Sequence, residues 1–215
     1  SGRAHNVVFA DGLEQCRRKA PRETYVVKAP LPHVWENNAE FDHASAVYDE
    51  GWGTNAVRLA RHTRHAFFVK PSLFVIADEL EPADGQPHTY EALFHLDAAN
   101  VKVDGLQVAT QDKGPALTLL AFGADGVDVV KGQKEPVVQG WLPDSSSGYG
   151  GVRPIPTAIY RKRAAGKTTL LYALCPSAEP AACPVKNLRL ADDTLTVTRL
   201  DGTEKAVRFS RALSE

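Results

Sequence analysis

The stretch Arg64-His65-Ala66-Phe67-Phe68-Val69-Lys70-Pro71-Ser72-Leu73-Phe74-Val75-Ile76-Ala77-Asp78 decides the fold class. Two apolar runs of strand length flank Lys70-Pro71-Ser72, and Pro71 presets the backbone angle that a tight turn requires. The stretch therefore predicts two strands joined by a turn. Arg64 and Asp78 stand at opposite ends of this hairpin, so we expect an ion pair across it.

Short apolar segments separated by turn residues run along the rest of the chain. They lie at 7–10, 24–28, 45–49, 90–96, 101–108, 116–122, 127–130, 158–161, 168–174 and within 188–209. Asp104-Gly105 predicts a hairpin turn, and Ala164-Ala165-Gly166 predicts a second, which would pair strands 158–161 and 168–174. Only Asp11 to Lys19 is a candidate for a short helix. The spacing predicts an all-β, antiparallel β-sandwich, with residues 1–215 as one domain.

The segment from Pro143 to Pro156 is rich in Ser, Gly and Pro, and it is predicted to be a long loop. Loops of this length in compact domains are usually functional or mobile. Trp141 and Tyr149 in this region are therefore better candidates for stacking on sugar rings than Trp35 or Trp52, which lie near other turns. A role as a core side chain is the alternative for each Trp.

Charge and composition narrow the class of partner. The net charge is −1 and the apolar fraction is 43%, which is ample for a core. We expect neither nucleic acid, which needs a basic surface, nor a membrane, because no apolar stretch reaches the length of a span. An acidic polysaccharide stays open as a partner, because it needs only a local group of cations. The chain offers one such group: Arg58, Arg61, His62, Arg64 and His65.

The chain has three cysteines. Cys175 and Cys183 bracket a short loop that contains proline, and Cys16 lies far away in sequence. One interpretation is a disulfide that fixes the loop in an oxidising compartment; the other is a pair of free thiols in a reducing cell. The absence of Cys-x-x-Cys argues against a zinc finger.

The opening segment, Ser1 to Gln15, pairs His5-Asn6 with a short strand that closes on Asp11-Gly12. The chain has no methionine, so we expect it to be part of a longer protein. The opening resembles the start of the C-terminal β domain of the heparinase II/III-like polysaccharide lyases. The resemblance continues in the same order through Arg61 to Asp78, Thr89 to Leu96, Gly140-Trp141-Leu142-Pro143, Tyr149-Gly150 and Pro154-Ile155-Pro156.

The resemblance implies a supersandwich-like β-sandwich that forms the C-terminal part of a longer lyase. Members of the family cleave polysaccharides that contain uronic acid by β-elimination. An upstream α/α toroid supplies a tyrosine and most of the cleft, and the β domain supplies a histidine, which by position is His5. No tyrosine here matches the family's base, so we expect the isolated chain to be inactive. We also expect a secreted or periplasmic protein.

The remaining candidate residues come from side-chain chemistry and position in the chain, and, for His95, from the resemblance. Asn6, Gln15, Arg64, Trp141 and Tyr149 are the candidates for substrate binding, although structural roles are the alternative for Gln15 and Arg64. His95 matches a metal ligand of some relatives. Val7 replaces a second histidine that those relatives use, and valine cannot ligate. We therefore expect no cofactor, with His95 as the first candidate ligand if a divalent metal such as zinc is bound.

A second hypothesis belongs to another class of protein. The chain would then be a carbohydrate-binding or purely structural β-sandwich module without a catalytic role. A third hypothesis is an unrelated secreted β module. The second hypothesis, a carbohydrate-binding module, predicts that the isolated 215 residues bind an oligosaccharide.

Overall fold

The computed structural model describes residues 2–15, 32–144, 146, 148 and 150–212. The strands are β1 (Val8–Ala10), β2 (His33–Asn37), β3 (Phe41–Tyr48), β4 (Ala60–Val69), β5 (Leu73–Pro82), β6 (His88–His95), β7 (Val101–Asp104), β8 (Gln107–Thr110), β9 (Ala116–Phe122), β10 (Gly126–Lys131), β11 (Trp141–Pro143), β12 (Val152–Pro154), β13 (Pro156–Ala164), β14 (Thr168–Ser177), β15 (Val185–Ala191), β16 (Thr194–Arg199) and β17 (Glu204–Arg208). A 3-10 turn, η1 (Gly2–Ala4), precedes them. Within the described residues, no helix is long and apolar enough to cross a membrane.

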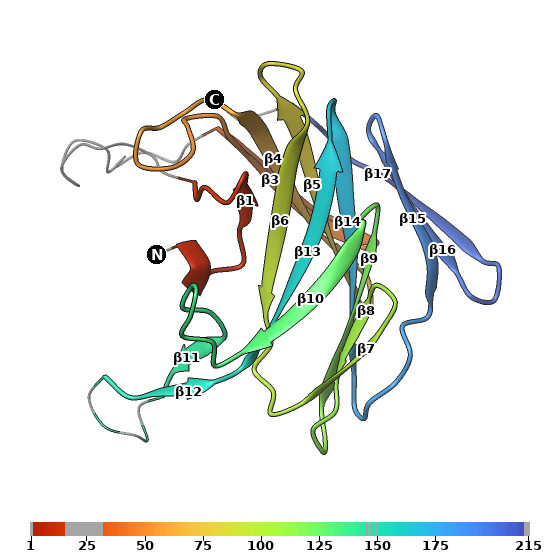
Figure 1. Cartoon of the computed structure of the whole chain (residues 1–215). Coiled ribbons are helices and arrows are strands. Elements are labelled where there is room, and N and C mark those ends of the chain that lie inside the picture. The colour runs from red at the N-terminus through yellow and green to blue at the C-terminus, as the bar shows by residue number, and fades with distance from the viewer. Residues whose placement is uncertain (1, 16–31, 145, 147, 149, 213–215) are drawn as a thin grey trace.

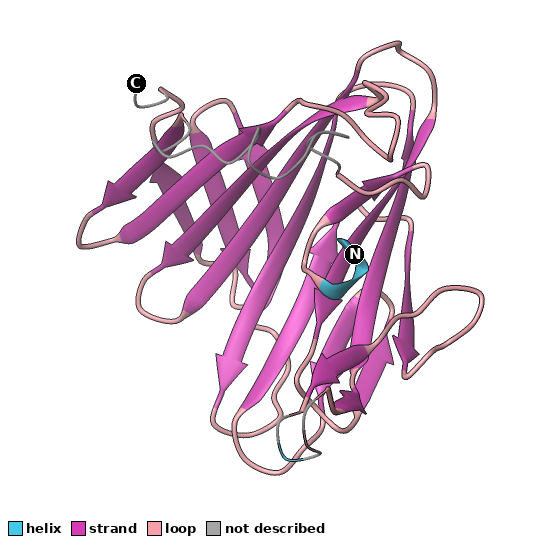
Figure 2. Ribbon diagram, turned by 90° about the vertical axis from the view of Figure 1, so that its left-hand side faces the viewer, coloured by secondary structure: helices cyan, strands magenta, loops and turns pink. Residues whose placement is uncertain are grey.

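The strands form three stacked layers of antiparallel sheet (Figure 1). An eight-stranded sheet, in the order β2-β3-β4-β5-β14-β9-β8-β7, is the central layer. A four-stranded sheet, β1-β6-β13-β10, covers one of its faces, and the three-stranded sheet β15-β16-β17 covers part of the other. The small β11-β12 hairpin (Figure 1) and η1, drawn in cyan beside the N-terminus in Figure 2, lie outside the four-stranded sheet. The predicted all-β antiparallel sandwich is confirmed.

Apolar side chains fill both gaps between the layers. The gap beneath the four-stranded sheet holds the larger aromatic side chains, which are fully buried: Trp52, Tyr90, Tyr160 and Tyr172. The gap beneath the three-stranded sheet contains Phe67, Val75, Leu195 and Val207. Because β4 and β5 contribute to both gaps, successive side chains along these strands must alternate between apolar surroundings on opposite faces.

The β4–β5 hairpin forms as predicted, with Val69 opposite Leu73 and Arg64 opposite Asp78. Side chains of β4 at even positions, such as His62 and Arg64, face the four-stranded sheet. Those at odd positions face the other way, and Phe67 lies in the core beneath the three-stranded sheet. The alternation assigns opposite faces to neighbouring members of the predicted cation group.

The predicted pairing of strands 158–161 and 168–174 is wrong. β13 pairs with β6 and β10 in the four-stranded sheet, whereas β14 pairs with β5 and β9 in the eight-stranded sheet. The chain therefore crosses from one layer to the other between them. Tyr160 and Tyr172 face each other across the core, with ring centroids 5.4 Å apart. Stacking the two strands in separate layers buries both aromatic rings, which a flat hairpin would leave side by side on one sheet.

Two other local predictions also differ from the structure. The segment from Pro143 to Pro156 is not one long loop, because β11 pairs with β12 and Pro156 begins β13. The described part of the candidate helix, residues 11–15, is a tight turn followed by isolated bridges. Asp11 and Gly12 both have positive φ, 49° and 73°, which is the geometry of a hairpin turn rather than of a helix. Residues 16–19 of that candidate helix and the predicted strand at 24–28 lie outside the described residues.

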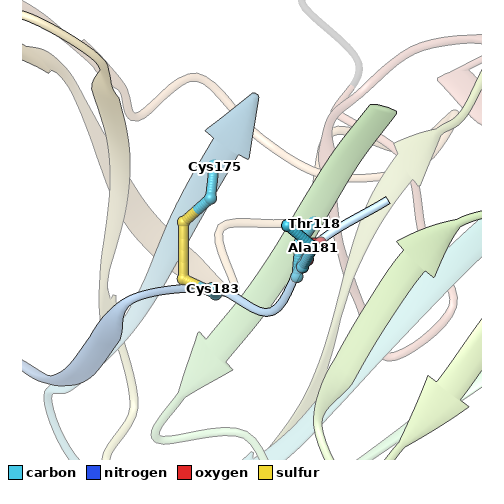
Figure 3. Close-up of a disulfide and its surroundings, with 4 residues drawn as sticks. All are labelled: Thr118, Cys175, Ala181 and Cys183. Carbon is cyan, nitrogen blue, oxygen red and sulfur yellow. A yellow bond between two sulfur atoms is a disulfide. The ribbon is translucent and has the colours of Figure 1, made fainter. Parts of the chain in front are cut away.

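Cys175 and Cys183 form a disulfide with their Cα atoms 5.7 Å apart (Figure 3). Cys175 lies on β14 of the central sheet, and Cys183 lies just before β15 of the three-stranded sheet. Both side chains are buried. Between them in sequence, the Ala181 carbonyl accepts a hydrogen bond of 2.6 Å from the Thr118 hydroxyl of β9. The disulfide therefore ties the three-stranded sheet to the central eight-stranded sheet.

Removing this bond should destabilise the fold without changing it. A Cys175→Ala/Cys183→Ala double variant should lose about 2–3 kcal/mol of unfolding free energy, because the loop closed by the disulfide no longer restricts the unfolded chain. Urea denaturation followed by circular dichroism measures the loss. The parent protein under reducing conditions is the control and should match the variant. An unchanged denaturation midpoint in both would contradict the stabilising role.

Candidate functional site

A buried ion pair lies under the N-terminal segment. The Asp78 carboxylate is fully buried, and it accepts hydrogen bonds from Arg64 Nε at 2.7 Å, from the Arg64 terminal nitrogen Nη2 at 2.8 Å and from His62 Nε2 at 2.8 Å. The predicted Arg64–Asp78 pair is therefore confirmed, as a bidentate contact. The Arg64 guanidinium, together with His62, holds the pKa of Asp78 well below its usual value, against the opposing effect of burial.

This group reaches the N-terminal segment through two further contacts. Arg64 Nη1 donates to the backbone carbonyl of Asn6. Gln15 Nε2 lies 2.7 Å from His62 Nδ1. Since the Nε2–H of His62 is directed at Asp78, its Nδ1 accepts a hydrogen bond from the Gln15 side-chain amide. Asn6, Gln15 and Arg64, all predicted to bind substrate, are thus joined in one network. Two N–H groups of Arg64 are not used in these contacts, and its role in substrate binding stays a prediction.

A second network anchors the same segment from β6. Asn6 Oδ1 accepts hydrogen bonds from the backbone N–H of His95 at 2.8 Å and from His95 Nδ1 at 2.9 Å. The Gln139 amide nitrogen lies 2.9 Å from His95 Nε2 and 2.9 Å from the Arg3 carbonyl. His95 Nε2 also lies 2.9 Å from the Arg3 carbonyl, which can only accept a hydrogen bond. A neutral imidazole that donates through Nδ1 to Asn6 and accepts at Nε2 from Gln139 leaves that carbonyl bonded by the Gln139 amide. Burial lowers the pKa of His95, which agrees with the neutral form.

His95 is therefore engaged at both ring nitrogens. A metal ion on either nitrogen would have to displace Asn6 or Gln139. Within the described residues, no group of three or more His, Cys, Asp or Glu side chains is arranged to hold a metal ion. The donor set around His95 consists of amides and backbone carbonyls, which does not fit the nitrogen and sulfur ligands that zinc prefers.

Arg3 provides the third anchor. Its guanidinium pairs with Glu91 of β6 at 3.3 Å and lies 4.4 Å from the centre of the Phe9 ring. Phe9 belongs to a small cluster on the outer face of the four-stranded sheet, together with Leu93 and Ile159. The 3-10 turn that precedes His5 is therefore held against this face of the sheet.

His5 itself is exposed. Its side chain makes no hydrogen bond to any other described residue, whereas its neighbours Arg3 and Asn6 are fixed from β4, β6 and Gln139. The imidazole lines an open hollow of about 380 Å³ with Gly2, Val7, Glu14 and Gln15. The hollow brings together two predicted site residues, His5 and Gln15, and adds Glu14.

Trp141 lies beside a neighbouring hollow of about 130 Å³ lined by Arg3, Ala4, Val138, Gln139 and Gly140. Its indole N–H donates to the Gln133 carbonyl at 2.9 Å, so its ring orientation is fixed. Arg3 and Ala4, which line this hollow, directly precede His5 in the chain. Tyr149 lies outside the described residues. Of the two other Trp candidates, Trp52 is a core side chain with its N–H bonded to the Ala60 carbonyl, and Trp35 is 66% exposed on the edge strand β2.

Sequence reasoning did not identify Gln139, Glu14 or Glu91 as members of the site. Gln139 precedes Gly140 in a segment without strand periodicity, and its contact with Arg3 spans 136 positions. No local pattern could have revealed that contact. The assembled site offers an exposed imidazole on a fixed backbone, together with carboxylate and amide groups. A histidine imidazole can take part in proton transfer or hydrogen-bond a carboxylate.

Replacing Asp78 should remove the buried ion pair that supports the N-terminal segment. Asp78→Asn leaves the Arg64 guanidinium partly buried without its counter-charge, and it should lower the free energy of unfolding at pH 7 by about 3–5 kcal/mol. Because folding lowers the pKa of Asp78, its contribution is present above its ordinary pKa of 3.8 and is lost as the pH falls towards the folded value. The difference between parent and variant should therefore shrink below about pH 4.

Urea denaturation at pH 7 and at lower pH measures this difference. Asp104→Asn on the exposed β7–β8 hairpin is the matched control, and it should stay within about 0.5 kcal/mol of the parent. An Asp78→Asn variant as stable as that control would show that the pair does not stabilise the fold.

The fold agrees with solved structures of lyases. The heparan sulfate lyase HepC from Pedobacter heparinus superposes with a TM-score of 0.66 at 16% identity, over 96% of this chain and 30% of that one. A heparinase III gives a TM-score of 0.60 at 13% identity, over 84% of this chain and 27% of that one. The chain thus spans less than a third of these proteins, and at such identities the likeness concerns the fold alone. A comparison with curated protein sequences found no match.

The sequence also matches a family model described as "Heparinase II/III-like, C-terminal", over residues 1–181. The matched part contains η1, strands β1 to β14 and every candidate site residue. It ends between Cys175 and Cys183, so β15 to β17 lie beyond it. The assignment of residues 1–215 to a single domain stays a prediction. The match covers most of the sequence, and the chain belongs to the heparinase II/III-like C-terminal family.

Proposed function

We propose that this chain is the β domain of a polysaccharide lyase that cleaves uronic-acid-containing polysaccharide by β-elimination, and that His5 belongs to a composite active site. One observation carries the proposal. The His5 imidazole is exposed in a hollow, while three independent sets of contacts hold the backbone on both sides of it. Such an arrangement keeps a reactive side chain in position without occupying it.

The reaction sets clear demands on the site. A base removes the proton on the carbon next to the uronate carboxyl, the electron pair forms the new double bond, and the sugar oxygen at the 4-position leaves with a proton. Negative charge that develops on the carboxylate must be stabilised. His5 supplies an imidazole for hydrogen bonding or proton transfer at the substrate. Gln15 and the Asn6 amide nitrogen lie beside it as groups able to bind sugar hydroxyls.

The rest of the cleft would come from an upstream α/α toroid domain. Exposed apolar side chains near the site support a contact with a further domain. Val138 borders the hollow beside Trp141, and Val152 lies on β12; they are 64% and 52% exposed. Isolated exposed apolar residues are common, but one just before the β11–β12 hairpin and one on it, both close to the candidate site, favour a docking surface.

The Cys175–Cys183 disulfide supports a secreted or periplasmic location, because such bonds persist in oxidising compartments. We propose that the reaction uses no cofactor. The proposed chemistry needs only proton transfer and charge stabilisation, and His95 is already bonded at both ring nitrogens.

In a polypeptide that carries both domains, His5→Ala should lower kcat by roughly 10²–10⁴-fold, the usual contribution of a positioned acid or base. Folding stability should stay within about 0.5 kcal/mol of the parent, because the side chain is exposed. The rate is followed by the ultraviolet absorbance of unsaturated uronate with heparan sulfate, hyaluronan, chondroitin and alginate. His33→Ala on β2, in another sheet, is the matched control and should leave kcat unchanged. Wild-type turnover by His5→Ala would exclude a catalytic role.

The isolated 215-residue chain should show no lyase turnover. Burial raises the pKa of Tyr90 to about 12 and raises the pKa of Tyr160 and Tyr172 as well, so these phenols do not ionise near neutral pH. All three lie in the core between the layers and cannot reach a polymer. The same absorbance assay on the isolated chain tests this. Measurable turnover would show that the domain carries a complete site of its own.

A further inference from the structure

A second, polar hollow lies on the opposite face of the eight-stranded sheet from the His5 network. Its volume is about 240 Å³, and its lining residues come from β3, β4, β5, the turn before β14 and the C-terminal tail. They are Ser45, Val47, Arg61, Thr63, His65, Glu79, Glu81, Lys167 and Arg211. None of the candidate site residues of the lyase proposal belongs to it.

The hollow lies where this face of the central sheet changes from apolar to polar. Along β4, Phe67 and Val69 are covered by the three-stranded sheet, whereas Arg61, Thr63 and His65 continue the same face beyond that cover. A face turned simply to solvent would carry exposed polar side chains. Here Ser45 and His65 are buried although they are polar, so the polar half of the face forms a recess rather than a flat surface.

One wall of the recess is held by a chain of contacts that runs from the exposed Arg211 to the buried His43. Arg211 donates to Glu79 at 2.7 Å, His65 Nε2 lies 3.1 Å from the same carboxylate, and His65 Nδ1 lies 3.1 Å from His43 Nε2. The His43 ring also stacks on Phe67, with centroids 4.4 Å apart. This wall is therefore ordered before any ligand arrives, which reduces the entropy lost on binding.

Four other side chains that line the recess are still available. The side chains of Ser45, Arg61, Thr63 and Glu81 make no hydrogen bond or ion pair with other described residues. Lys167 adds an ammonium group 3.5 Å from Glu79. Arg61 and Lys167 can pair with a carboxylate, while two hydroxyls and the Glu81 carboxylate can bond sugar hydroxyls as acceptors or donors.

We propose that this recess binds a hydroxylated monocarboxylate of the size of one sugar unit, such as a uronate. Three cationic residues, Arg61, Lys167 and Arg211, face two acidic ones, Glu79 and Glu81, so the lining has an excess of one positive charge. That balance favours a monoanion, and Glu81 disfavours a multiply charged anion. The volume is below the ~300–1,000 Å³ of sites for drug-sized ligands, which suits a single ring. The proposal goes beyond the lyase function and does not depend on it.

The test is a titration of the isotope-labelled 215-residue chain with glucuronate, followed by amide NMR shifts. The account predicts saturable shifts at Arg61, Thr63 and Glu79. Glucose, which has the hydroxyls but no carboxylate, should bind at least about tenfold more weakly, as expected when a charge-assisted hydrogen bond is lost. Arg61→Ala should weaken glucuronate binding by a similar factor.

Two further variants separate this recess from other surfaces. Arg189→Ala removes an exposed arginine of β15 outside the recess and should bind glucuronate like the parent. His5→Ala should also bind like the parent, whatever it does to lyase turnover. Absence of saturable shifts, unchanged binding by Arg61→Ala, or loss of binding in His5→Ala but not in Arg61→Ala would each overturn the proposal.

Discussion

The buried Asp78 carboxylate is the interaction on which the site depends. A carboxylate without solvent needs compensating charge and hydrogen bonds; here Arg64 provides the charge, and Arg64 and His62 together provide the hydrogen bonds. Both side chains also bond the N-terminal segment. Arg64 donates a hydrogen bond to the Asn6 carbonyl, and His62 accepts one from Gln15. The need to satisfy one buried charge thus fixes the N-terminal segment that carries His5 at Asn6 and at Gln15.

The three-layer arrangement explains why β4 can serve two sites. Its even positions face the four-stranded sheet and lead to the N-terminal segment, while its odd positions face the three-stranded sheet and the polar recess. The cation group read in the sequence is thereby divided. His62 and Arg64 belong to one side, Arg61 and His65 to the other, and Arg58 precedes the strand. One strand, through its alternation alone, supplies polar groups both to the network that holds the N-terminal segment and to the polar recess.

Much of the fold followed from local patterns, because the strands are short and bounded by turn residues. The Lys70-Pro71-Ser72 hairpin and the Arg64–Asp78 pair across it needed only strand geometry. The order of the sheets did not follow. Two consecutive strands such as β13 and β14 can pair or stack, and the decision lies in the burial of Tyr160 against Tyr172, which no local pattern contains. Likewise, the resemblance identified His5, but Gln139 is brought beside Arg3 by the fold alone.

The central claim is that the Asp78 group holds the segment that presents His5. Amide hydrogen exchange of Gly2–Val7, compared between the parent and Asp78→Asn under native conditions, tests it most directly. The account predicts faster exchange at the His5 and Val7 amides in the variant. Amides of β13 and β14 should lose only the protection that corresponds to the lower free energy of global unfolding. Unchanged protection of His5 and Val7, in a variant whose strands have lost stability, would contradict the claim.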